Sequence, residues 1–120
     1  MGHSTASGRA ERRLSEAFGI SDEEMTRRSQ LAIQSLKPPK PSRGYRDVNF
    51  TVASVATNRL FFGSIFANLE GGGYTVSLTR SNGNGTSDQI IRFESYDNLT
   101  KAKNAIYEAT QVPKPRRGRS

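Results

Sequence analysis

The stretch Arg59–Ala67, with the sequence RLFFGSIFA, is the most apolar run in the chain. Its odd and its even positions both carry large apolar side chains. Because successive side chains of a strand point to opposite faces, such a run is typical of a strand with material packed on both sides. The run therefore predicts the middle of a sheet.

Three shorter runs, at 47–53, 74–79 and 89–94, alternate apolar and polar residues with the period of two that is typical of half-buried strands. Glycines interrupt the chain at 71–73 and at 83–85, between the later runs. Glycine tolerates the positive φ that hairpin turns require, so these segments predict hairpins. A phosphate-binding loop would need a helix directly after it, and none is expected here. The four strands are therefore expected to form an antiparallel meander.

The clearest helix start is at Ser21, which forms a capping box with Glu24. In this motif the Ser21 hydroxyl accepts from the Glu24 N–H, and the Glu24 carboxylate accepts from the Ser21 N–H. The helix is expected to span 22–36, because two prolines follow it. Its thin apolar stripe is typical of a helix that docks on another structure. A shorter helix, stopped by Gly19, is expected before it.

A second long helix is expected after the sheet, with Ser95 or Asp97 as its cap. Asp97 and Lys101 are spaced for an ion pair along this helix. The apolar residues recur at intervals of three and four, as on one face of a helix. They are Leu99, Ala102, Ile106 and Ala109.

The segment 37–44, KPPKPSRG, predicts a stiff basic linker, because its three prolines favour an extended path. We therefore predict an N-terminal arm at 1–45, a ββββα domain at 46–111 and a disordered basic tail at 112–120. The fold class is α+β. It consists of a four-stranded antiparallel meander with the C-terminal helix packed on one face, preceded by the helical arm.

The 120 residues include no cysteine and one histidine, His3. A disulfide framework and a thiolate metal site are therefore excluded, and no Gly-rich phosphate loop ending in Lys-Ser or Lys-Thr occurs. We expect a protein that is not an enzyme and uses no cofactor. No apolar run approaches the ~20 residues of a membrane span, and no apolar secretion signal follows Arg9. We expect an intracellular protein, in the cytoplasm, a nucleoid or a virion.

The net charge of +7 is concentrated at the two ends of the chain. Residues 1–46 contain nine Lys or Arg and five Asp or Glu, whereas residues 47–111 contain five and six. Residues 112–120 contain four basic residues and no acid. Basic flanks are typical of proteins that contact phosphates, although a tail can also serve only to keep a protein soluble. The tail residues expected to contact phosphates are Lys114, Arg116, Arg117 and Arg119.

One face of the predicted sheet is expected to meet the C-terminal helix. The apolar residues assigned to that face are Phe50, Val52, Leu60, Phe62, Phe66, Val76, Leu78, Ile91 and Phe93. The opposite face would then carry an aromatic ring, hydroxyls and two arginines, which suit single-stranded nucleic acid because bases stack on aromatic rings. The binding residues predicted there are Arg59, Phe61, Thr75, Ser77 and Arg92. The alternative is that the N-terminal helix or a second subunit buries Phe61 and Ile65.

The order of four strands and one helix over 47–111 is similar in layout to the repeat unit of the Whirly and Pur-alpha single-strand-binding proteins. The resemblance is one of layout, and it implies binding of single-stranded DNA or RNA. We therefore expect a nucleic-acid-binding protein that forms a homodimer or a larger assembly. Two other classes remain open. One is a structural assembly subunit, such as a small viral coat or nucleoid-type protein whose basic termini hold the genome; the other is a protein-binding regulator.

Overall fold

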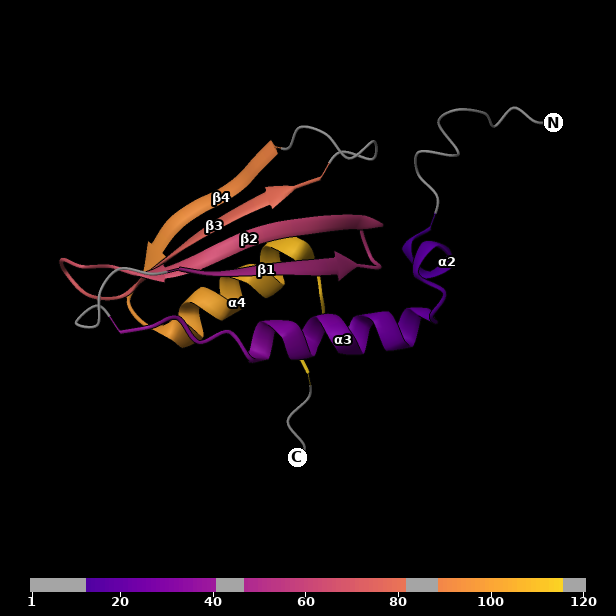
Figure 1. Ribbon diagram of the computed structural model, residues 1–120, viewed down its shortest axis with the longest axis horizontal. Coiled ribbons are helices and arrows are strands. Elements are labelled where there is room, and N and C mark those ends of the chain that lie inside the picture. Colours follow the sequence, from indigo (N-terminus) through magenta and orange to yellow (C-terminus); the bar gives the residue numbers. More distant parts are fainter. Residues whose placement is uncertain (1–12, 41–46, 82–88, 116–120) are drawn as a thin grey trace.

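Four antiparallel strands form one sheet in the computed structural model of the chain, which describes residues 13–40, 47–81 and 89–115. Each strand lies beside its neighbour in the sequence (Figure 1). The strands are β1 (Asp47–Ser54), β2 (Arg59–Ala67), β3 (Tyr74–Arg80) and β4 (Gln89–Tyr96). The described helices are α2 (Leu14–Phe18), α3 (Asp22–Gln34) and α4 (Leu99–Thr110). The predicted α+β class, with its meander and its C-terminal helix, is confirmed.

The two long helices form a layer against one face of the sheet. Helix α4 crosses behind the sheet in Figure 1 and packs against β3 and β4, whereas α3 runs along the edge strand β1. The two helices also contact each other. Of the described helices, none crosses the face that is turned toward the reader in Figure 1. The described residues therefore form a helix layer and a sheet layer, and none of the described helices covers the other face of the sheet.

The core lies between the sheet and the helix layer. Its buried residues are Ile33, Leu36, Val52, Phe61, Ile65, Val76, Leu78, Ala102, Ile106, Tyr107 and Val112. The apolar stripe predicted along α4 is confirmed, because Ala102 and Ile106 are fully buried and Leu99 and Ala109 pack against the cluster. Burial of these side chains supplies most of the stabilising free energy, as it does in other small domains.

Helix α3 belongs to this core and also satisfies the edge of the sheet. Met25 is 2% exposed and Ile33 is fully buried. The Ser29 hydroxyl donates to the Ala53 carbonyl oxygen at 2.6 Å and accepts from the Ala53 N–H at 3.2 Å. It thereby satisfies both backbone groups of a residue on an edge strand, where they would otherwise be open to pairing with another chain. The helix was expected as an arm suspended on the linker; it is instead docked on its own sheet.

The pairing of β1 with β2 decides which side chains of the central strand enter the core. Val52 is opposite Phe61 and Val48 is opposite Ile65, and directly opposed residues share a face of the sheet. Phe61 is 2% exposed and Ile65 is fully buried. The predicted assignment, with Phe61 and Ile65 on the face away from the helices, is therefore wrong.

The loop between β1 and β2 is the physical reason for this difference. Ser54 pairs with Arg59, so the loop at 55–58 has four residues, and every even-numbered residue of β1 faces an odd-numbered residue of β2. A shift of one residue would move each side chain of a strand to the other face. The residues of β2 that were expected in the core lie on the open side instead. They are Leu60, Phe62 and Phe66.

A bulge in β4 places two side chains of that strand on the face opposite to the predicted one. The pairing with β3 shifts between Leu78 and Thr79, which makes Ile91 an extra residue of β4. Ile91 packs against the core, and Arg92 is on the same face because it is opposite Leu78. Phe93 is on the other face and is 64% exposed. The predictions of a core position for Phe93 and an open-side position for Arg92 are therefore both wrong.

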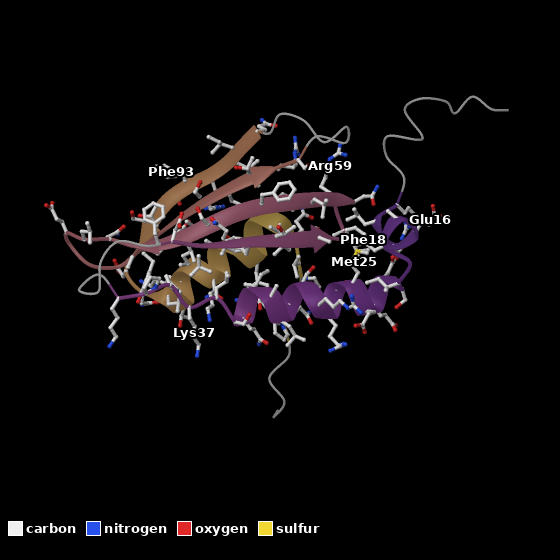
Figure 2. All side chains as sticks on the ribbon, in the orientation of Figure 1. Glu16, Phe18, Met25, Lys37, Arg59 and Phe93 are labelled. Carbon is white, nitrogen blue, oxygen red and sulfur yellow. The ribbon has the colours of Figure 1, made fainter. Side chains whose placement is uncertain are left out.

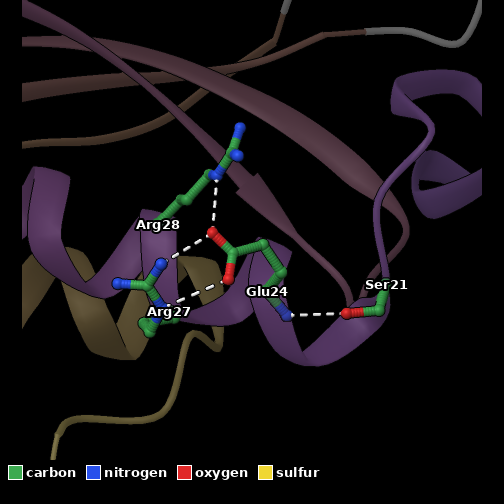
Figure 3. Close-up of polar contacts among 4 residues, drawn as sticks. All are labelled: Ser21, Glu24, Arg27 and Arg28. Carbon is green, nitrogen blue, oxygen red and sulfur yellow. Dashed lines mark hydrogen bonds and ion pairs between the residues drawn. The ribbon is translucent and has the colours of Figure 1, made fainter.

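The start of α3 has half of the predicted capping box. The Ser21 hydroxyl accepts from the Glu24 N–H at 3.1 Å, as predicted (Figure 3). The Glu24 carboxylate accepts from the Arg27 and Arg28 guanidinium groups at 2.7 and 2.9 Å, instead of from the Ser21 N–H. Hydrogen bonds from Arg28 and then Arg27 lower the pKa of Glu24. The Glu24 carboxylate therefore binds the two arginines and not the Ser21 N–H of the predicted capping box.

Helix α4 begins after a different cap from the predicted one. Strand β4 continues through Tyr96, so the cap of α4 is Asn98 and not Ser95 or Asp97 as expected; its side chain accepts from the Lys101 N–H at 2.9 Å. The predicted Asp97–Lys101 ion pair is present at 3.4 Å.

The three glycines at 71–73 have φ values of 78°, 72° and 82°, which confirms the first hairpin turn. The second glycine turn, at 83–85, lies outside the described residues.

The packing of α3 predicts that the chain depends on it for stability. Removing residues 1–43 would expose the surface covered by Met25, Ile33 and Leu36, each worth about 1.5–3 kcal/mol of burial. Their sum is comparable to the ~5–15 kcal/mol stability of a typical domain. We expect residues 44–120 to lose cooperative thermal unfolding, followed by circular dichroism, while a chain lacking only residues 1–12 keeps it. An unchanged midpoint for residues 44–120 would show that α3 is an independent arm.

Candidate nucleic-acid interface

The face of the sheet opposite the helix layer is the candidate interface, and we call it the open face. The strand pairings place on it the alternate residues of each strand that do not point into the core. They are Asp47, Asn49, Thr51, Ala53, Leu60, Phe62, Ser64, Phe66, Thr75, Ser77, Thr79, Ile90, Phe93 and Ser95. This set contains apolar, hydroxyl and amide side chains and one charged one, the exposed carboxylate of Asp47 opposite Phe66. Its chemistry is therefore aromatic and polar, and none of its strand residues is a cation.

Three phenylalanines form the corners of a triangle on this face. Phe62 and Phe93 are 38% and 64% exposed, and Phe66 is half-buried. Phe62 and Phe66 are four residues apart on β2, which corresponds to about 13 Å along a strand. Phe93 is on the second strand from β2, in line with Ser64, which puts it about 12 Å from each of the other two. Figure 2 shows Phe93 over β4.

Hydroxyl groups lie between the three rings. Ser77 is opposite both Ser64 and Phe93, and it is partly exposed near the middle of the triangle. The Thr75 hydroxyl donates to the Asn68 amide oxygen at 2.6 Å and lies 2.8 Å from the Ser95 hydroxyl. Thr75 is 6% exposed, so its hydroxyl serves the sheet itself. The sequence placed Thr75 and Ser77 on the face away from the helices, and both are there.

Three residues of the predicted site, Arg59, Phe61 and Arg92, are on the helix side of the sheet. Arg59 is there because it is opposite the fully buried Ser54, so its predicted position on the opposite face is wrong. Phe61 is a core residue, as its burial shows. The Arg92 guanidinium donates to the Tyr96 hydroxyl at 3.1 Å and to the Glu94 carboxylate at 3.3 Å, and the Tyr96 hydroxyl donates to Glu94 at 2.8 Å. The hydrogen bond with Tyr96 raises the pKa of Arg92, and burial raises the pKa of Tyr96. The cluster therefore pairs a guanidinium with a neutral phenol and a carboxylate.

Arg59 and Arg80 lie at one end of the sheet. Arg59 is the first residue of β2, where Figure 2 shows it, and it is half-buried. Arg80 is the last residue of β3 and donates to the Gln89 side-chain oxygen at 2.9 Å. Arg80 is opposite Phe61, so it shares the helix-side face with that core residue, and Thr79 is the residue opposite Phe62. These two cations are therefore at the end of the sheet on its helix side and do not belong to the open face.

The predicted tail residues are only partly within the described chain. Lys114 is exposed and follows the buried Val112 after the end of α4. The other three tail residues, Arg116, Arg117 and Arg119, lie outside the described residues. The structure thus leaves Lys114 on the helix layer, away from the open face.

Sequence reasoning missed the three phenylalanines that the structure brings together. The length of the loop at 55–58 could have indicated the positions of Phe62 and Phe66. A four-residue loop pairs the even residues of β1 with the odd residues of β2, which puts the even residues of β2 on the other face. For Phe93 the signal was the adjacent pair Ile90-Ile91, which interrupts the alternation of β4. A strand that breaks its own period at one residue is typical of a bulge.

Comparisons with known protein families, with curated proteins and with solved structures found no match to this chain. Within the described residues, no helix is long and apolar enough to cross a membrane.

Proposed function

We propose that the protein is a non-enzymatic binding protein for single-stranded DNA or RNA, with the open face as its stacking surface. The observation that carries the proposal is the triangle of Phe62, Phe66 and Phe93 on a sheet face that no described helix crosses. The proposal places the protein where such nucleic acid occurs, in the cytoplasm, a nucleoid or a virion.

The geometry of the triangle suits an extended strand. Stacked bases follow one another at about 3.4 Å, so rings about 12 Å apart receive bases that have been splayed out of the stack. Every base has an aromatic face, so stacking of this kind tolerates different sequences. The Ser64 and Ser77 hydroxyls between the rings are both donors and acceptors, and they suit base edges or a ribose hydroxyl.

Phosphate contacts come from outside the open face. The strand residues of the face include one carboxylate, Asp47, and no cation, whereas residues 1–46 and 112–120 carry the excess of positive charge. Arg59 and Arg80 are on the helix side at the end of the sheet, so a strand that stacks on Phe62 would meet them only by continuing around that end. The proposal therefore separates a salt-insensitive stacking contribution from a salt-sensitive contribution of the basic residues.

The main competing function is a structural assembly subunit that uses the same face to contact a second copy. Ile90 and Phe93 are 68% and 64% exposed, and Leu60 adds to the same surface. Exposed apolar side chains that gather on one surface mark interaction sites for proteins as well as for other ligands. Light scattering of the free and oligonucleotide-bound protein separates the two functions, because a face buried between copies is closed to nucleic acid.

Truncating the exposed rings should weaken binding without unfolding the protein. We expect Phe62→Ala and Phe93→Ala each to cost ~1–3 kcal/mol of binding, or about 5- to 140-fold in affinity for oligo(dT), measured by fluorescence anisotropy. Leu31→Ala, which shortens a side chain that is 50% exposed on α3, should change neither affinity nor melting temperature. Phe61→Ala should instead cost ~3–5 kcal/mol of folding stability.

Equal affinities for the Phe62→Ala, Phe93→Ala and Leu31→Ala variants would remove the open face from the binding site. A concentration-dependent dissociation of oligomers by the two phenylalanine variants, with unchanged binding, would favour the assembly subunit.

The basic tail should add affinity without sequence preference. Each phosphate that it neutralises on a single strand contributes about −0.7 to the slope of log K against log salt, so deleting residues 113–120 should flatten the slope by up to roughly 3. Affinity at low salt should fall equally for two unrelated oligonucleotides, because phosphate contacts carry no sequence information. A titration at several salt concentrations checks this. An unchanged slope would show that the tail only keeps the protein soluble.

A further inference from the structure

A groove runs over the outer surface of the helix layer, on the far side of the molecule from the open face. It consists of two adjoining hollows of about 510 and 540 Å³ on the two flanks of α4. Asn104, Tyr107 and Lys114 line both of them. We call this surface the helix groove. One hollow extends to Arg92 of β4, and the other extends to Gln34 at the end of α3.

The helix groove is strongly basic. The charged residues that line it are Arg92, Lys101, Lys103, Lys114 and Glu108, so four cations face one carboxylate. This excess is greater than the composition of residues 47–111 would suggest, because that segment as a whole has one acid more than bases. The fold therefore gathers positive charge on α4 and the chain that follows it.

Lys103 and Lys114 are the least neutralised of these cations. Within residues 13–40, 47–81 and 89–115, neither they nor the neighbouring Lys37 form an ion pair. On the other flank, Lys101 is 3.4 Å from the Asp97 carboxylate and Arg92 is 3.3 Å from that of Glu94. The field that attracts an anion is therefore strongest on the side of the groove next to α3.

The surroundings of Lys103 disfavour its charged form. Its ammonium group donates to the Gln34 carbonyl oxygen at 2.7 Å, at the C-terminal end of α3. Burial lowers its pKa, and the positive charge of Lys37 lowers it further. An ammonium group has three donors, so the bond to Gln34 leaves two for another partner. A bound anion would offset both the burial and the repulsion from Lys37.

The ligand has to be extended to use the whole groove. Lys101 and Lys103 are two residues apart on a helix and hence about 200° apart around it, on opposite flanks of α4. Lys114, which lines both hollows, lies between these flanks. A single phosphate fits one hollow, whereas a chain of phosphates reaches the cations of both.

We propose that the helix groove binds a chain of phosphates, with one phosphate between Lys103 and Lys114 beside the Asn104 amide and others directed toward Lys101. Two sources share this chemistry: the backbone of a nucleic acid and inorganic polyphosphate. Only the first of these rests on the proposed function. The open face and the helix groove are then separate surfaces, one for bases and one for phosphates.

The test compares full-length variants in calorimetric titrations with tripolyphosphate at low salt. Loss of two charge-assisted hydrogen bonds should weaken binding by about tenfold or more in K103Q/K114Q. R27Q/R28Q removes the same net charge from α3, outside the groove, and should change the affinity by less than about threefold. Phe93→Ala, which leaves the groove intact, should change nothing. The single variant K114Q is measured as well, because Lys114 is exposed and its substitution should leave the protein folded even if the double variant misfolds.

The same variants identify the source of the phosphates. If the groove holds a nucleic-acid backbone, K103Q/K114Q also flattens the salt slope for oligo(dT) by about 1.4, and tripolyphosphate competes with the oligonucleotide. If it holds inorganic polyphosphate, the slope for oligo(dT) changes by no more than the roughly 0.7 that Lys114 supplies as a residue of the basic tail. Absence of tripolyphosphate binding, or an equal loss in R27Q/R28Q, would overturn the proposal. Neither result would affect the proposed function, which depends on Phe62 and Phe93.

Discussion

The pairing of β1 with β2 is the constraint on which the rest of the structure depends. It sets Phe61 opposite Val52 and Ile65 opposite Val48, and these four side chains point into the space that the helices close. Once that register is fixed, Phe62 must lie on the other side of the sheet, because neighbouring side chains of a strand alternate. The bulge at Ile91 has the same effect on β4 and sends Phe93 to the open face. The candidate interface is therefore a consequence of how the core is filled.

Local chemistry made the fold predictable from the sequence, whereas the site depended on information that is not local. The alternation of the strands, the Ser21 cap and the glycines at 71–73 each act within a few residues, and they led to the correct α+β meander. The run RLFFGSIFA is apolar at odd and even positions alike, so its composition cannot say which side faces the helices. The answer lies in the length of the loop at 55–58, and in one extra residue of β4.

The helix layer and the sheet layer differ in chemistry as well as in position. The open face is aromatic and rich in hydroxyls, with one carboxylate at Asp47, whereas α4 and the chain after it gather lysines around Asn104 and Tyr107. Helix α3 joins the two layers, because Ile33 enters the core and Ser29 satisfies the edge of β1. A nucleic-acid-binding function uses this division directly, since stacking and phosphate neutralisation are distinct interactions with different responses to salt.

Photochemical crosslinking tests most directly whether the register exposes the proposed surface to a nucleic acid. The full-length protein is irradiated with oligo(dT), and the crosslinked residues are located by mass spectrometry with fragment ions that separate Phe61 from Phe62. The account predicts crosslinks at Phe62 and Phe93 and none at Phe61, which is 2% exposed. Crosslinks at Phe61, or crosslinks confined to residues outside the open face, would contradict it.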